Sequence, residues 1–180
     1  MNIDSPLRIG ISACLVGQEV RFDGGHKRDP LLIEIFGPDV EWVPVCPEVE
    51  VGMSTPREPL RLERDAGCVR MVTIDTRIDY TGRMEVWSQK RLAGLARLEL
   101  DAYVLKSDSP SCGKDGVKVF RFGAAPSRDG RGLFAEALIA AMPWLPVEDE
   151  ARLRDRNVRN DFLARIAAHR ESRDLRGRHG

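Results

Sequence analysis

Three cysteines stand directly after apolar runs, in positions where buried strands would end. Cys14 follows residues 7–13, Cys46 follows residues 42–45, and Cys112 lies in a polar turn after residues 102–105. Because the carboxyl ends of parallel strands open onto one shared crevice, we expect the three thiols to meet there. Thiolates suit soft metals, so this pattern favours zinc or an iron-sulfur cluster. Three ligands leave one coordination position open, which is typical of catalytic metals.

The spacing of the cysteines leaves a simpler interpretation open. They lie 32 and then 66 residues apart, which matches no compact metal-binding pattern, and free cysteine is often only a small buried side chain. Each cysteine has a turn-forming residue close to it, namely Gly17, Pro47 or Gly113, and this favours the metal site over a buried structural thiol. Cys68 is expected at the entrance of a strand and so at the opposite sheet edge, as a buried structural thiol rather than a fourth ligand.

Glu48 is the first candidate for moving protons, because it lies two residues after Cys46. If that cysteine faces the crevice, the Glu48 carboxylate is close enough to act there as a general acid or base. The alternative is a solvated loop glutamate, or a partner for Arg57.

Three hydroxyls precede Cys112 at alternating positions, namely Ser107, Ser109 and Ser111. In an extended turn they point the same way, so they can orient a substrate carbonyl or donate hydrogen bonds to a sulfide ligand. They can equally cap the backbone of their own turn.

Strands alternating with helices have to position these residues. We predict strands at 7–13, 41–46, 69–74, 102–105 and 117–122, helices at 30–36, 81–100, 133–142 and 149–169, and loops at 47–59 and 123–130. This alternation predicts an α/β fold: a single domain with a mostly parallel sheet flanked by helices, in a Rossmann-like three-layer arrangement. The domain is expected to span residues 1–170, followed by a basic, flexible tail over 171–180.

Overall charge excludes a general attraction to nucleic acid or anionic membrane. The 180 residues contain 28 Lys and Arg and 28 Asp and Glu, which balance. No run approaches the roughly 18 apolar residues of a membrane span, and no secretory signal precedes Cys14. We therefore expect a cytoplasmic protein without membrane contact, in a compartment where thiols stay reduced.

Two further features allow weaker interpretations. Nine arginines face four acids in residues 151–180; they could contact RNA phosphates, but the balanced charge of the chain favours a solvated helix face. Residues 130–135 fit a loose Gly-x-Gly-x-x-Ala dinucleotide pattern in a poor context, so the glycines more simply open a helix. His26 lies in a turn and is expected to be solvated.

Several motifs occur together in a characteristic order. They are Ile11–Leu15, Arg21–Gly25, Val45–Val49, Thr55–Arg57, Lys106–Ser107 with Ser109–Gly113, and Gly132–Ala135. Together they resemble a small bacterial family that includes iron-sulfur-dependent thiouracil desulfidases, over about residues 7 to 165. The same domain also occurs fused to a second domain in proteins that act on thiolated tRNA.

The resemblance implies a 4Fe-4S cluster held by three cysteines, here Cys14, Cys46 and Cys112, with one iron left open. The sulfur of a thiocarbonyl substrate such as 4-thiouracil would bind that iron while water attacks the carbon. Glu48 matches the position expected to move the proton and Ser109 a position expected to assist. Ser111 is the third catalytic candidate.

The predicted function is therefore desulfidation of thiolated nucleobases or nucleosides, with weak tRNA contact possible for the basic end. The alternative is a non-enzymatic RNA-binding module with a structural metal site. A nucleotide-dependent redox protein, using the glycines near Gly130, is the third interpretation.

Overall fold

The structure is a computed structural model, and it describes residues 6–177. Its first sheet is entirely parallel, with the strand order β2-β1-β5-β8. The strands are β1 (Arg8–Ser12), β2 (Glu41–Val45), β5 (Ala102–Leu105) and β8 (Val147–Asp149). This sheet confirms the predicted α/β fold class.

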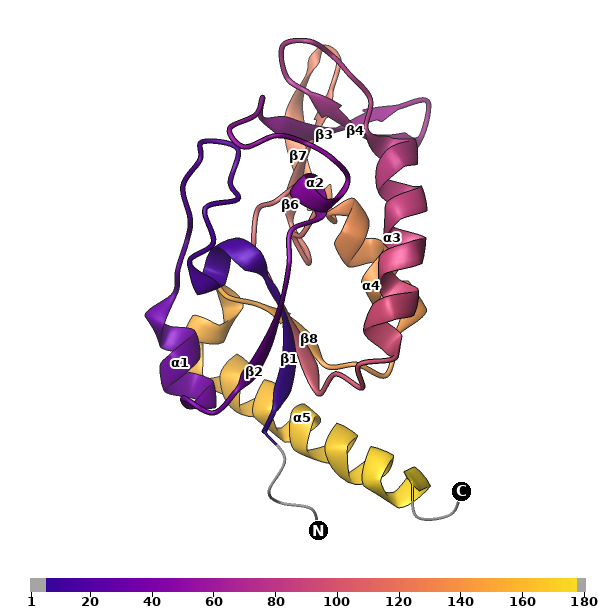
Figure 1. Cartoon of the computed structure of the whole chain (residues 1–180). Coiled ribbons are helices and arrows are strands. Elements are labelled where there is room, and N and C mark those ends of the chain that lie inside the picture. Colours follow the sequence, from indigo (N-terminus) through magenta and orange to yellow (C-terminus); the bar gives the residue numbers. More distant parts are fainter. Residues whose placement is uncertain (1–5, 178–180) are drawn as a thin grey trace.

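Helices cover both faces of the parallel sheet (Figure 1). On one face, Ile9 and Ile11 pack with α1 (Pro30–Phe36) and α5 (Arg156–Gly177). On the other, Tyr103 and Leu105 pack with α3 (Thr81–Ala96) and α4 (Leu133–Ala141). Successive side chains of a strand point to opposite faces, so β5 supplies both cores, with Ala102 and Val104 on the first face and Tyr103 and Leu105 on the second.

A second sheet, which the sequence did not predict, lies beyond the carboxyl ends of the first. Its order is β4-β3-β6-β7, with β3 and β6 parallel and the other pairs antiparallel. The strands are β3 (Leu60–Asp65), β4 (Cys68–Thr73), β6 (Val117–Arg121) and β7 (Ala124–Gly130). Leu62, Met71 and Val119 join the core beneath α3 and α4, so the second sheet shares a core with the first.

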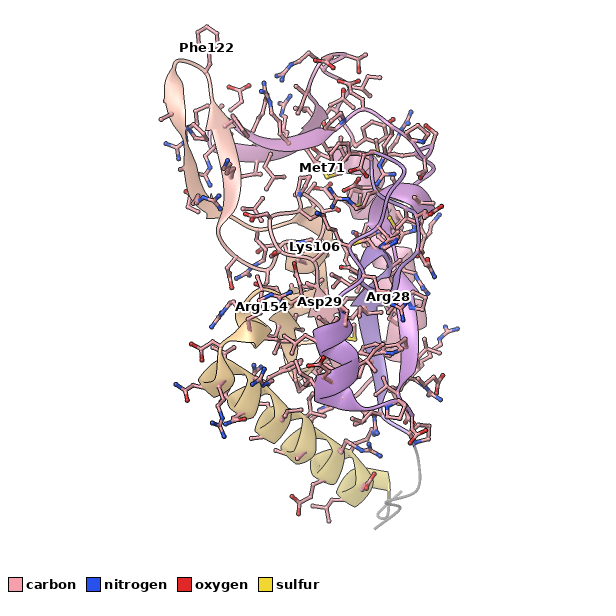
Figure 2. All side chains as sticks on the ribbon, turned by 90° about the vertical axis from the view of Figure 1, so that its left-hand side faces the viewer. Arg28, Asp29, Met71, Lys106, Phe122 and Arg154 are labelled. Carbon is pink, nitrogen blue, oxygen red and sulfur yellow. The ribbon has the colours of Figure 1, made fainter. Side chains whose placement is uncertain are left out.

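Several predicted boundaries differ from the structure. Residues 47–50, expected within a loop, form a short helix, and the helix expected to reach residue 100 ends at Ala96. Residues 124–130, expected as a loop, form the return strand of a hairpin whose exposed tip carries Phe122 (Figure 2). The last helix, expected from residue 149, begins at Arg156, after the strand β8 and a 3-10 turn, η2 (Arg152–Arg154).

The last helix continues to Gly177, past the boundary at residue 170. That boundary stays a prediction, and residues 178–180 of the expected tail lie outside the described residues. Within residues 6–177, no helix combines the length and the apolarity that crossing a membrane requires.

Candidate active site

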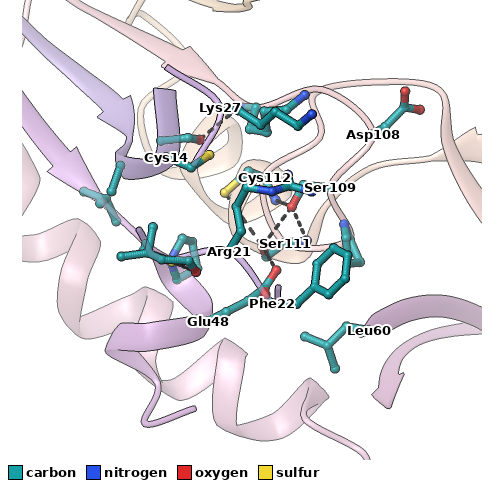
Figure 3. Close-up of a pocket in the computed structure, with 18 of the residues that line it drawn as sticks. Cys14, Arg21, Phe22, Lys27, Glu48, Leu60, Asp108, Ser109, Ser111 and Cys112 are labelled. Atoms are coloured by element: carbon teal, nitrogen blue, oxygen red, sulfur yellow. Dashed lines mark hydrogen bonds between the residues drawn. The ribbon is translucent and has the colours of Figure 1, made fainter. Parts of the chain in front are cut away.

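Three cysteines line one cavity of about 380 Å³ at the carboxyl edge of the parallel sheet (Figure 3). Cys14 lies in the 3-10 turn η1 (Ala13–Val16) directly after β1, and Cys46 is the N-cap of the short helix α2 (Pro47–Glu50) after β2. Cys112 lies in the loop after β5. None of the three forms a disulfide. The structure therefore brings together the three thiols that the sequence placed at strand ends.

The loop of Cys112 is fixed by its packing on the start of α4. The backbone N–H of Leu133 donates to the carbonyl of Pro110 at 3.1 Å, and that of Phe134 donates to the carbonyl of Ser111 at 3.0 Å. A Cβ at Gly132 would lie 2.5 Å from the Ser111 carbonyl. The N–H groups directly after Gly132 thus hold the cysteine loop. The close approach of the loop explains why residue 132 is glycine, without a bound dinucleotide.

A directed chain of hydrogen bonds leads from this loop to Glu48. Ser111 Oγ donates to Glu48 Oε1 at 2.8 Å, because a carboxylate can only accept. Ser109 Oγ accepts from the backbone N–H of Ser111 and of Cys112, and it lies 3.0 Å from Ser111 Oγ. Because the Ser111 hydroxyl donates its hydrogen to Glu48, it accepts from Ser109 Oγ, which is therefore the donor in the serine pair. The chain therefore runs from Ser109 through Ser111 to the carboxylate.

Arg57 holds the other oxygen of Glu48. Its Nε and Nη2 donate to Glu48 Oε2 at 2.9 and 2.6 Å, and Nη2 also donates to the carbonyl of Val20 at 2.8 Å. Both side chains are largely buried. Glu48 thus lines the cavity and also pairs with Arg57, which was one of the interpretations left open for it. The two charge-assisted hydrogen bonds from Arg57 orient the carboxylate.

Burial keeps the thiols protonated in the protein without metal. It raises the pKa of Cys14 from its ordinary value to about 11, against the lowering effect of the Lys106 ammonium. Burial also raises the pKa of Cys46 and, most strongly, that of Cys112. Metal binding at this cavity therefore has to displace protons from the thiols.

The thiols of Cys14, Cys46 and Cys112 line one cavity but do not point at a single position. In the part of the chain that the structure describes, no three His, Cys, Asp or Glu side chains come close enough together to hold a single metal ion. The cavity whose wall holds the three thiols has room for more than one water-sized molecule. Soft sulfur donors around such a space fit a metal cluster better than a lone ion.

The other sequence candidates lie outside this cavity. Cys68 begins β4, as expected, but it is exposed rather than buried and does not line the cavity. His26 is exposed, and its Nδ1 accepts from the backbone N–H of Arg28.

Many of the C-terminal arginines are engaged within the protein. Arg154 pairs with Asp29, Arg165 with Asp161, and Arg173 with Asp101. These pairs favour the interpretation as a structural helix face over an RNA-binding one.

Sequence reasoning missed two residues that shape the cavity. Lys106 lines it, and the buried Glu150 holds the Lys106 ammonium from the end of β8. Both follow a strand immediately, which is the same signal that identified the cysteines.

The fold and the thiol-lined cavity define an α/β protein with a candidate metal-cluster site, and comparison with known proteins gives its family. A family model described as 2-thiouracil desulfurase matches residues 9–150. The chain belongs to this family and is an enzyme, as the sequence motifs indicated.

Two relatives illustrate the similarity. The uncharacterized protein YbbK of Bacillus subtilis (strain 168) is 32% identical over 109 residues, which are 57% of this chain and 71% of YbbK. The solved structure of the [4Fe-4S]-dependent thiouracil desulfidase TudS matches with a TM-score of 0.63 and 28% identity, over 82% of this chain and 93% of that one.

Proposed function

We propose that this protein is a desulfidase that removes sulfur from thiolated nucleobases or nucleosides, for example converting 4-thiouracil to uracil and sulfide. The observation that carries the proposal is the placement of three reduced thiols and the Glu48–Ser111–Ser109 chain around one cavity. Membership in the 2-thiouracil desulfurase family and the similarity to TudS support it. We place the enzyme in the cytoplasm, and weak contact with tRNA stays a prediction.

Cys14, Cys46 and Cys112 would hold a 4Fe-4S cluster, as the cofactor of TudS suggests. When bound, such a cluster supplies a Lewis-acidic iron for the sulfur of the substrate. The fit rests on the chemistry of the donor set: three thiols without disulfides around a cavity, and no fourth cysteine in its wall.

The chain's own residues would handle the proton and the water. Glu48 Oε1 is the acceptor at the end of the serine chain, so it can take a proton from a water that attacks the thiocarbonyl carbon. Water adds across the carbon–sulfur double bond, and the remaining carbon–sulfur bond then breaks as the carbon–oxygen double bond forms. Both protons of the water leave with the sulfide, so the reaction needs no oxidant or reductant. Arg57 keeps the carboxylate in place throughout.

The proposal is tested by assaying 4-thiouracil loss and sulfide release with protein reconstituted without oxygen. Glu48→Gln should lower kcat by about 10²- to 10⁴-fold, because the neutral amide cannot accept the proton. Glu58→Gln is the matched control, since Glu58 is outside the cavity wall and bonds only the loop at residues 75–76. Full turnover by Glu48→Gln, or no turnover by the wild-type protein with its cluster, would contradict the proposal.

A further inference from the structure

Phe22 supplies the only aromatic ring in the wall of the cavity, among the residues 6–177 that the structure describes. It is 39% exposed, unlike the large apolar side chains that form the two cores. It belongs to the sequence motif Arg21–Gly25, which has no part in the proposed proton transfer. A single exposed phenylalanine on an open surface is ordinary, but aromatic rings in the wall of a cavity are typical of ligand sites.

The backbone of Phe22 is held by the same residue that holds Glu48. The backbone N–H of Arg57 donates to the Phe22 carbonyl at 2.9 Å, and the Arg57 side chain donates to the Glu48 carboxylate. A tight turn fixes the segment further, because the Gly24 N–H donates to the Arg21 carbonyl at 3.0 Å. Arg57 therefore ties the segment that carries the ring to the candidate general base.

Arg21 lies over one face of the Phe22 ring. Its guanidinium carbon is 5.3 Å from the ring centroid, which is within the range of a cation–π contact. The Arg21 Nε also lies 3.4 Å from Asp23 Oδ1, in the same turn. Because the guanidinium contacts one face of the ring, a ligand in the cavity has the other face to stack on.

We propose that Phe22 is a substrate-binding residue: the flat ring of the thiolated base stacks on its ring, and this contact selects aromatic thiocarbonyl compounds over saturated ones. The inference rests on the proposed function. Figure 3 shows Phe22 in the same cavity wall as Glu48 and Ser111, the groups that would act on the stacked base. Stacking accepts any flat ring, because every base has a π-face. Phe22 thus supplies affinity, and the polar groups of the wall supply orientation.

The test measures KM and kcat for 4-thiouracil in protein reconstituted without oxygen. Phe22→Leu keeps an apolar side chain but loses the ring, so KM should rise about tenfold, as expected for the loss of one base–aromatic contact. Its kcat should change little, because stacking is equally strong in the ground state and the transition state. Phe22→Tyr keeps the ring and should keep KM. Phe122→Leu is the matched control: it makes the same exchange at an exposed hairpin tip outside the cavity wall, and should leave KM unchanged.

Two further readouts separate stacking from simple apolar contact and from the proposed function. Uracil should inhibit the wild type more strongly than 5,6-dihydrouracil, which has a saturated ring, and Phe22→Leu should reduce this preference. Equilibrium dialysis of 4-thiouracil against the metal-free protein should show about tenfold weaker binding by Phe22→Leu, without any need for turnover.

The inference is overturned if Phe22→Leu binds 4-thiouracil as tightly as the wild type, or if Phe22→Tyr loses as much affinity as Phe22→Leu. Equal inhibition of the wild type by uracil and 5,6-dihydrouracil also overturns it. A wild-type protein that binds 4-thiouracil through Phe22 but releases no sulfide would refute the proposed function and leave the stacking contact standing. A wild-type protein that neither binds nor converts 4-thiouracil would refute both.

Discussion

Replacing Gly132 by alanine should damage the cysteine loop without altering any side chain of the cavity. The backbone of Gly132 has φ −63° and ψ 141°, which alanine adopts freely, so the cost is purely steric. The new Cβ would lie 2.5 Å from the carbonyl carbon and oxygen of Ser111 and 2.7 Å from the backbone nitrogen of Cys112. Backbone atoms cannot rotate away as a flexible side chain can, so the loop has to move by about 1 Å to reach ordinary van der Waals contact.

The expected destabilisation is about 1–3 kcal/mol, the usual cost of forcing an extra methyl group into a packed site. For a chain of this length it lowers Tm by roughly 2–10 °C. Gly94→Ala is the matched control. Gly94 is exposed in α3, and a Cβ there would have no neighbouring atom within 4 Å, so alanine should stabilise the protein by about 0.5–1 kcal/mol.

Urea unfolding measures both effects, and the iron content after reconstitution reports on the loop. We expect Gly132→Ala to lose stability and to retain less iron, and Gly94→Ala to gain stability with its iron unchanged. The reasoning is refuted if Gly132→Ala is as stable as the wild type and binds as much iron, because the loop would then not be fixed by its contact with α4.

Two further predictions concern the buried groups of the site. Burial raises the pKa of Cys14 to about 11 in the folded, metal-free protein, whereas in the unfolded chain it is near the ordinary value of 9. The free energy of unfolding should therefore not change through Cys14 below pH 9, and it should fall by about 2–3 kcal/mol as the pH rises to 11. Urea unfolding should show a smaller fall over this pH range in Cys14→Ser. Arg57→Lys keeps the charge but loses the pair of hydrogen bonds to Glu48, so kcat/KM for 4-thiouracil should fall about 10²-fold. Arg61→Lys is the control, because Arg61 lies outside the cavity wall, and it should leave kcat/KM unchanged.

Three strands of the parallel sheet, β1, β2 and β5, could be predicted because they are short and apolar and a chemically distinct residue follows each of them. Ile9 and Ile11 alternate with residues that face the other layer, and Asp29 with Pro30 marks the start of α1, where the Asp29 side chain accepts from the Leu31 N–H. The same strand ends identified Cys14, Cys46 and Cys112, since parallel strands deliver their carboxyl ends to one edge.

Two strands of the second sheet, β4 and β6, match the strands predicted at 69–74 and 117–122, but β3, β7 and the arrangement in a separate sheet were not predicted. Residues 60–65 hold only two apolar side chains among charged ones, whose ion pairs, such as Arg61 with Glu63, form only in the folded sheet. Residues 124–130 contain Pro126 and Gly130, which usually indicate a loop, yet they pair with β6 across an irregular hairpin. The contacts of Glu150 were hidden for a similar reason, since its partners Lys106 and Ser107 lie more than 40 residues away in the chain.

The iron content and visible spectrum of protein reconstituted without oxygen test the central claim most directly. The comparison is between the wild type and four variants in which Cys14, Cys46, Cys68 or Cys112 is replaced by serine. We predict a broad sulfide-to-iron absorption in the wild type and in Cys68→Ser, and its loss in the other three variants. A spectrum that survives replacement of Cys14, Cys46 or Cys112, or that disappears in Cys68→Ser, would contradict the proposed three-cysteine site.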